Sequence, residues 1–224
     1  MMRAMALDTI QIETGDHPSA TIIMLHGLGA DGNDFVPFVE EIDLASVGPV
    51  RWVFPHAPTM PVTINGGYVM RAWYDILGTD MAKREDETGL RRSMADVRAL
   101  LDAERARGIA SRRIVLAGFS QGSAMTLLTG LRYPERLAGL VGMSGYLPLA
   151  DALGAERAQA NADVPVFLAH GRSDPVVPFA AGTATRDALR SAAYPVEWHD
   201  YPMPHSVCPE EIRDLERWLQ RVLQ

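Results

Sequence analysis

The chain has 224 residues, 47% of them hydrophobic and 22% charged, and a formal net charge of −7. This length fits one large α/β domain, and this composition excludes a disordered or collagenous chain. The acidic balance, without any dense Lys/Arg run, excludes a strong electrostatic attraction to nucleic acid or anionic lipid.

Short apolar runs rich in Val, Ile and Leu alternate along the chain with amphipathic runs of helical spacing. Such runs are typical of strands buried on both faces of a parallel sheet. A final run, Val196 to Tyr201, alternates more strongly, and we expect it nearer a sheet edge. The buried strands are predicted at residues 22–25, 50–54, 114–117, 140–143 and 166–169.

Two amphipathic helices are predicted over residues 91–107 and 209–223, each with its apolar side chains on one stripe. Strand followed by helix, repeated, predicts an α/β fold in which helices cover both faces of a mostly parallel central sheet. Because the sequence has no internal repeat, low-complexity tract or linker, we expect a single domain over residues 1–224.

The segment from about residue 55 to 89 departs from this pattern. It is rich in Pro, Gly and turn residues, yet it holds Tyr68, Met70, Trp73 and Tyr74. Long loops inside compact domains are usually functional or disordered, and the large apolar side chains favour a packed functional loop. An excursion that merely covers the core is an equally weighted alternative.

Residues 118–122, Gly-Phe-Ser-Gln-Gly, follow a predicted strand and precede an apolar helical pattern. A GxSxG motif in this setting is the nucleophile elbow of α/β hydrolases, whose glycines leave room around a strained serine turn. Ser120 is therefore the candidate nucleophile. A tight glycine-rich turn with an idle serine is the alternative, and it explains the flanking strand and helix less well.

A serine nucleophile needs a histidine to accept its proton and a carboxylate to orient that histidine. The chain order in this fold is Ser, then Asp or Glu, then His, which leaves His199 and His205. We favour His205, which lies past the end of the final strand, and expect His199 to be structural. Asp174, just after the strand at 166–169, is the candidate acid. Its alternative role is to cap the helix that begins near Phe179.

Acyl transfer also needs N–H donors for the oxyanion of the tetrahedral intermediate. One comes from the residue after the nucleophile, which is Gln121, and one from the loop after an early strand. We expect the second donor to be Leu28, in the glycine-rich loop at 26–32. That loop lacks GxGxxG and the P-loop lysine, so nucleotide binding has little support.

Other side chains are weaker candidates for chemistry. Ser144 also ends a strand, but a glycine follows it at once and no helix pattern begins there, which predicts a turn. Cys208 follows the histidine and lies outside any elbow, so it is expected to be an ordinary thiol. His26 and His56 have no partners at ligand spacing, so no metal or other cofactor is expected.

Several absences bear on location. Cys208 is the single cysteine, so no internal disulfide forms. The N-terminus has only a short small or apolar run before Asp8, too short for the core of a signal peptide. No stretch approaches the roughly 18 apolar residues of a membrane span. We therefore expect a cytoplasmic protein.

Several motifs recur together in one protein family. They are HGLGADGNDF at 26–35, FPHAP at 54–58, RAWYDI at 71–76, GFSQG at 118–122, GRSDPVVP at 171–178 and the histidine at 205. With these motifs the chain resembles the phospholipase/carboxylesterase family of the α/β-hydrolase superfamily, which contains small carboxylesterases and acyl-protein thioesterases. The resemblance implies Ser120, Asp174 and His205 as a catalytic triad, with Leu28 and Gln121 as oxyanion donors.

The resemblance also implies that the segment containing WYDI forms part of a loop over an apolar acyl groove. Trp73 and Leu77 would then bind substrate. Val177, Ile64 and Met70 are further candidate walls of that groove.

The sequence thus predicts a carboxylesterase that cleaves esters of short to medium acyl chains through an acyl-enzyme. An acyl-protein thioesterase or a lysophospholipase acting on longer chains is the alternative with the same chemistry. A non-catalytic relative that binds a small apolar ligand is the alternative from another class. A dehalogenase or epoxide hydrolase would need an aspartate in place of Ser120.

Apolar residues on the long loop have two alternative roles that the sequence leaves open. They could form a homodimer interface or a substrate entrance that faces a membrane.

Overall fold

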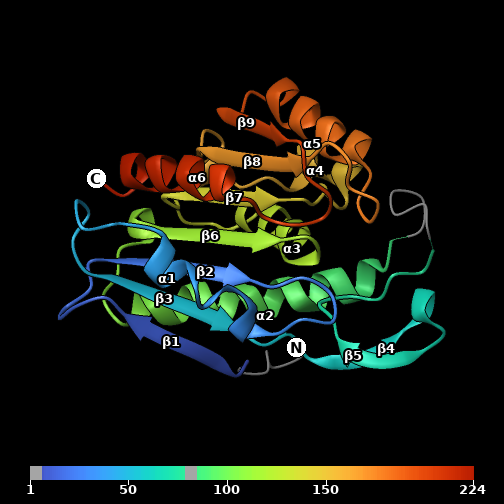
Figure 1. The fold of residues 1–224 in the computed structure, drawn as a ribbon, viewed down its shortest axis with the longest axis horizontal. Coiled ribbons are helices and arrows are strands. Elements are labelled where there is room, and N and C mark those ends of the chain that lie inside the picture. Colours follow the sequence, from blue (N-terminus) through green and yellow to red (C-terminus); the bar gives the residue numbers. More distant parts are fainter. Residues whose placement is uncertain (1–6, 79–84) are drawn as a thin grey trace.

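A computed structural model describes residues 7–78 and 85–224 of the chain. Its centre is a seven-stranded sheet in the order β1-β3-β2-β6-β7-β8-β9 (Figure 1). β1 runs antiparallel to β3 at one edge, and the other neighbouring strands of this sheet are parallel. The strands are β1 (Thr9–Glu13), β2 (Ala20–Leu25), β3 (Val50–Pro55), β6 (Ile114–Phe119), β7 (Gly139–Met143), β8 (Val166–Gly171) and β9 (Val196–Tyr201).

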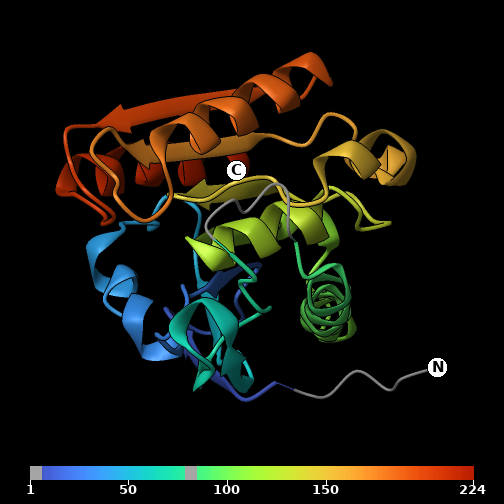
Figure 2. The same cartoon turned by 90° about the vertical axis from the view of Figure 1, so that its right-hand side faces the viewer.

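Helices cover both faces of the sheet (Figure 2). One core layer receives apolar side chains from α2 (Glu87–Ala106), α3 (Gln121–Gly130) and α5 (Phe179–Ser191). The other layer receives them from α1 (Phe38–Glu41) and α6 (Pro209–Val222). Because alternate side chains of each central strand enter opposite layers, these strands are apolar throughout. The short helix α4 (Leu153–Glu156) and 3-10 turns at Gly32–Phe35, Thr63–Asn65, Ser111–Arg113, Ala150–Ala152 and Gln159–Asn161 complete the connections.

The predicted α/β fold with a mostly parallel sheet is therefore confirmed, and so is the edge position of β9. The strand β1 was missed because it is a half-exposed edge strand without an apolar run. α2 begins earlier than predicted, since the Asp86 side chain accepts a hydrogen bond from the Gly89 N–H and caps the helix. Within the described ranges, no helix is both long enough and apolar enough to cross a membrane.

The strand order reverses between β2 and β6. The chain leaves β2 toward β3 on one side and leaves β6 toward β7 on the other, so the connections diverge and open a crevice at the carboxyl ends of these strands. β2 and β6 are paired up to Leu25 and Gly118. The loop at 26–32 and Ser120 consequently leave the sheet side by side.

The segment at 55–78 contains regular structure, which corrects the expectation of a long irregular loop. β4 (Thr59–Val62) and β5 (Tyr68–Arg71) form an antiparallel hairpin at the carboxyl end of the sheet (Figure 1). Gly66 and Gly67 turn the chain between the two strands with φ of 65° and 81°. The strands are short, largely exposed and interrupted by a proline, so they lack the apolar periodicity that predicts a strand. Residues 79–84 of the predicted loop lie outside the described residues.

Candidate active site

Ser120 lies in a strained turn between β6 and α3, with φ of 55° and ψ of −118°. A side chain on Gly118 would place its Cβ 2.3 Å from the backbone of Gly122, and one on Gly122 would place it 2.2 Å from the Leu25 carbonyl oxygen. Both glycines are therefore required for strand and helix to approach each other and β2. The backbone has the strand-turn-helix shape that GxSxG predicted.

Ser120, His205 and Asp174 are joined by two hydrogen bonds. The distance between Ser120 Oγ and His205 Nε2 is 2.9 Å, and that between His205 Nδ1 and Asp174 Oδ2 is 2.6 Å. Since a carboxylate only accepts, Nδ1 carries the imidazole proton and Nε2 is free to accept from the serine hydroxyl. Loops after β6, β8 and β9 thus bring together three residues that are far apart in the sequence.

The Asp174 carboxylate is fully buried and held on both oxygens. Its Oδ1 accepts from the N–H groups of Val176 and Val177 at 2.8 and 2.9 Å, while Oδ2 faces His205. The alternative role as a helix cap is wrong, because Pro178 occupies the N-cap position of α5 and no side chain caps it. The hydrogen bonds that the Asp174 carboxylate accepts come from its own loop and from His205.

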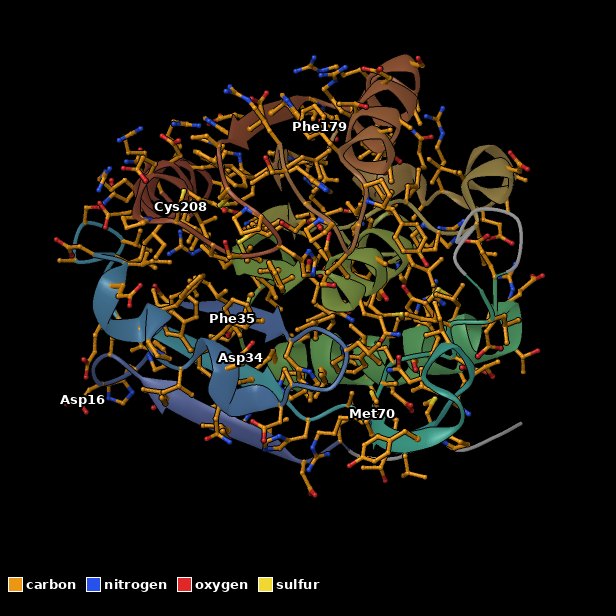
Figure 3. All side chains as sticks on the ribbon, turned by 45° about the vertical axis from the view of Figure 1, so that its right-hand side comes forward. Asp16, Asp34, Phe35, Met70, Phe179 and Cys208 are labelled. Atoms are coloured by element: carbon orange, nitrogen blue, oxygen red, sulfur yellow. The ribbon has the colours of Figure 1, made fainter. Side chains whose placement is uncertain are left out.

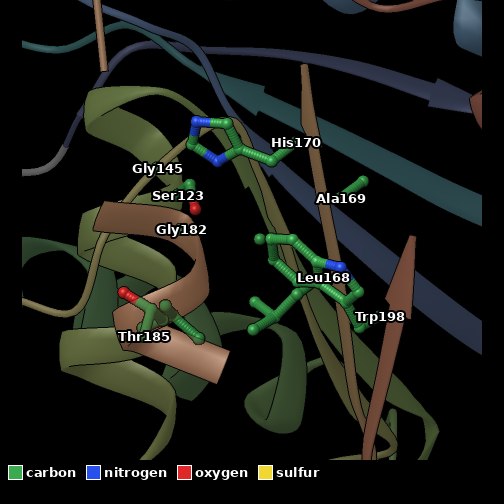
Figure 4. Close-up of a pocket in the computed structure, with 10 residues that line it drawn as sticks. Ser123, Gly145, Leu168, Ala169, His170, Gly182, Thr185 and Trp198 are labelled. Carbon is green, nitrogen blue, oxygen red and sulfur yellow. The ribbon is translucent and has the colours of Figure 1, made fainter. Parts of the chain in front are cut away.

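A water-sized cavity of about 10 Å³ lies beside His170, between α3, β8 and α5 (Figure 4). Ser123, Leu168, His170 and Thr185 line it together with neighbouring residues. His170 Nε2 donates to the Val177 carbonyl at 2.9 Å and lies 3.5 Å from Asp174 Oδ2, and burial lowers the His170 pKa. The cavity is too small for a substrate. The neutral His170 imidazole, through its bond to the Val177 carbonyl, supports the loop that carries Asp174.

A groove of about 440 Å³ opens at Ser120, and its wall is mostly apolar. Four of the predicted substrate or oxyanion residues line it, namely Leu28, Ile64, Gln121 and Val177. The other lining residues are Asn65, Tyr74, Ile76, Gly78, Tyr146, Pro175, Val176 and Pro178. The hairpin, the turn at the end of β2 and the loop after β8 together form this groove.

The other three predicted groove residues lie elsewhere. Trp73 is fully buried. Leu77 is 36% exposed and lies in the sequence between Ile76 and Gly78, which line the groove. Met70 lies on β5, where its Sδ accepts from Asn65 Nδ2 at 3.5 Å (Figure 3). None of them is among the residues that line the groove. Trp73 instead donates its indole N–H to the His26 carbonyl and its backbone N–H to the Gln121 side-chain oxygen.

A pair of tyrosines in the groove was missed by the sequence analysis. The hydroxyls of Tyr74 and Tyr146 lie 2.9 Å apart. Burial raises the pKa of Tyr146 to about 12, so both groups stay neutral near pH 7. The motif WYDI could have drawn attention to Tyr74, whereas nothing in the pattern around Tyr146 predicts that it reaches the groove.

Leu28 and Gln121 both line the groove together with Ser120. Gln121 is the first residue of α3, so its N–H belongs to the helical turn that has no intrahelical acceptor. The loop containing Leu28 passes close to the serine, since a Cβ on Gly27 would lie 3.2 Å from Ser120 Cβ. The Gly29 N–H is used elsewhere, in a bond of 2.9 Å to the Arg71 carbonyl.

His26 anchors the start of that loop. Its Nδ1–H donates to the Gly27 carbonyl at 2.7 Å, and its Nε2 accepts from the Ala57 N–H at 3.0 Å. Burial lowers the His26 pKa to about 4, so the ring is neutral. Among the residues that the structure describes, no three His, Cys, Asp or Glu side chains are grouped to hold a metal ion.

The rival residues take no part in the two hydrogen bonds that join Ser120, His205 and Asp174. His199 is on β9, where its Nε2 is 3.0 Å from Glu197 Oε1. Cys208 precedes α6, and burial raises its pKa (Figure 3). Ser144 is buried at the carboxyl end of β7, with φ of 49°, and no helix follows it directly.

The fold, with its serine elbow between β6 and α3, is that of an α/β hydrolase. A family model described as phospholipase/carboxylesterase matches residues 8–223, and the chain belongs to this family. It is therefore a hydrolase of the esterase and thioesterase type.

Several known proteins resemble the chain over nearly its whole length. Acyl-protein thioesterase 1 of Mycosarcoma maydis is 41% identical to it, over 96% of this chain and 95% of that protein. The crystal structure of Zea mays acyl-protein thioesterase 2 has a TM-score of 0.86 and 31% identity, and covers 97% and 99% of the two chains. Arabidopsis thaliana SOBER1 has a TM-score of 0.86 and 32% identity, over 92% and 99%.

Proposed function

We propose that the protein is a serine hydrolase in which Ser120 is the nucleophile, His205 the general base and acid, and Asp174 the residue that orients His205. The observation that carries this proposal is the pair of hydrogen bonds that joins the three side chains at the mouth of an apolar groove. The chain order and the fixed imidazole tautomer fit the same roles.

We further propose that its substrates are thioesters of long acyl chains, as in an acyl-protein thioesterase. The names of the relatives at 37–41% identity favour this alternative over a carboxylesterase for short or medium chains. The groove supports it, since about 440 Å³ falls in the usual range of ligand sites and the wall is predominantly apolar. The hairpin segment at 55–78 would then act as part of the acyl-binding wall.

The reaction would proceed in two halves. Ser120 Oγ attacks the thioester carbonyl carbon while its proton passes to His205 Nε2; the C–S bond then breaks and His205 protonates the leaving thiolate. Water next gives a proton to His205 and attacks the acyl-serine carbonyl carbon. The bond between that carbon and Ser120 Oγ then breaks while His205 returns the proton to Oγ, which releases a carboxylic acid and restores Ser120. The N–H groups of Leu28 and Gln121 would stabilise the oxyanion in both halves.

The test is a rate series with S-acyl peptide thioesters and the corresponding p-nitrophenyl esters, with acyl chains from acetyl to palmitoyl. We expect kcat/KM to rise with chain length and to be higher for thioesters. Ser120→Ala should lower kcat by at least about four orders of magnitude. Ser144→Ala is the matched control, because Ser144 is also a buried serine with positive φ at the end of a strand.

Each result decides between the candidates. Rates that peak at short chains would return the preference to a small-ester carboxylesterase. Retained turnover in Ser120→Ala would refute the nucleophile. Failure of the wild-type protein to react with a fluorophosphonate would favour the non-catalytic binding alternative.

A further inference from the structure

The side chain of Gln121 is turned away from Ser120 and toward the segment that follows the hairpin. Its Oε1 accepts from the Trp73 N–H at 2.8 Å, and its Nε2 donates to the Tyr74 carbonyl at 2.8 Å. The residue is only 4% exposed, so both bonds are shielded from water. The first residue of α3 is thereby fixed to the backbone of residues 73 and 74.

Trp73 continues this connection to the loop that follows β2. Its Nε1–H donates to the His26 carbonyl at 2.9 Å, and the two rings lie 5.4 Å apart. Trp73 is 0% exposed. A single residue is thus held through its backbone by Gln121 and holds His26 through its side chain.

The hydrogen bonds of Gln121 to Trp73 and of Trp73 to His26 form a bridge between α3 and the loop at 26–32. The two ends of this bridge are the two proposed sources of oxyanion donors. Gln121 supplies one N–H itself, and His26 lies two residues before Leu28, which supplies the other. The strands beneath them are paired only up to Leu25 and Gly118, so the donors lie where the sheet no longer fixes their separation. An oxyanion hole works only when both donors reach about 2.7–3.1 Å from one developing charge.

We infer that Trp73 and the amide side chain of Gln121 are positioning residues that set the distance between the Leu28 and Gln121 N–H groups. This inference rests on the proposed function, because it assigns those two N–H groups to the oxyanion. The same segment carries Tyr74 into the groove, so one wall of the groove is tied to the bridge.

The experiment compares three variants with the wild-type enzyme. Trp73→Phe keeps an aromatic ring but removes the donor to His26, and Gln121→Met keeps the side-chain length but removes both polar ends. Trp52→Phe is the matched control, because Trp52 is a buried tryptophan, 2% exposed, on β3. For each protein we would measure kcat and KM with one thioester, the affinity for a trifluoromethyl ketone with the same acyl group, and thermal stability.

We expect kcat to fall about tenfold to a hundredfold in Trp73→Phe and Gln121→Met, with KM changed by less than about twofold. Complete loss of a donor typically costs about a hundredfold to a thousandfold, and a displaced donor should cost less. Because the ketone forms a tetrahedral adduct that resembles the transition state, its affinity should fall by the same factor as kcat/KM. Trp52→Phe should lose stability but keep kcat and ketone affinity.

Two results would overturn the inference. One is a kcat for both bridge variants that matches the control, and the other is a lower kcat with unchanged ketone affinity. If Trp73→Phe does not fold, Gln121→Met decides alone by the same criteria. Ser120→Ala separates the two claims: its inactivity beside unaffected bridge variants refutes the bridge only, whereas its retained turnover refutes the proposed function.

Discussion

Two regions of different construction meet at Ser120. The polar region consists of turns at the ends of β6, β8 and β9, where Asp174 is fully buried and its carboxylate is bonded on both oxygens. The groove region consists largely of surface segments, in which Ile64 is 43% exposed and Val176 is 59% exposed. The sheet therefore fixes the reacting groups, while exposed side chains outside the sheet shape the space for the acyl chain. Changes in the first region should alter the reaction, and changes in the second should alter the choice of substrate.

The largest effect is expected in the polar region, from Asp174→Asn. The amide would favour the wrong imidazole tautomer at His205, and kcat should fall about 10⁴-fold with little change in KM. Steady-state kinetics with a long-chain thioester measures this. Asp187→Asn, at an exposed aspartate on α5, is the control. A loss of less than about tenfold in Asp174→Asn would show that Asp174 does not orient the base.

An intermediate effect is expected where the two regions join, at His26. Burial lowers its folded-state pKa to about 4, below the 6.5 of an unperturbed histidine. As the pH falls, His26 therefore becomes protonated in the unfolded chain before it does so in the folded protein. The stability of the fold is retained above pH 6.5 and declines as the pH falls from 6.5 toward 4.

Denaturant unfolding of the wild type and His26→Gln at several pH values tests this. The wild-type advantage should shrink by about 3 kcal/mol between pH 7 and pH 4, because glutamine does not titrate. His170, whose pKa burial also lowers, contributes acid sensitivity of the same sign in both proteins. A difference that stays constant with pH would mean that His26 is not buried neutral.

The smallest effect is expected in the groove region, from Ile64→Asp. A charge in the apolar wall should lower kcat/KM for palmitoyl thioesters about tenfold and leave acetyl esters nearly unchanged. Val69→Asp is the control, since Val69 is exposed on the same hairpin but does not line the groove. Equal losses for acetyl and palmitoyl substrates would contradict a wall role for Ile64.

This division also explains what the sequence could predict. The central strands, the elbow at Ser120 and the choices of Asp174 and His205 follow from local apolar runs and from chain order. The hairpin was missed because its strands are exposed and short, and Tyr146 was missed because it approaches the groove only through tertiary packing. Trp73 was predicted to bind substrate, but a motif does not reveal that its side chain points to a backbone carbonyl.

The most direct test of the central claim is to trap the acyl-enzyme. The protein would be mixed with a palmitoyl thioester, quenched in acid within one turnover, digested and analysed by mass spectrometry. We predict a palmitoyl mass shift on Ser120 that is absent from Ser120→Ala and present in Ser144→Ala. An acyl group on Cys208, or hydrolysis without any modified peptide, would contradict the account.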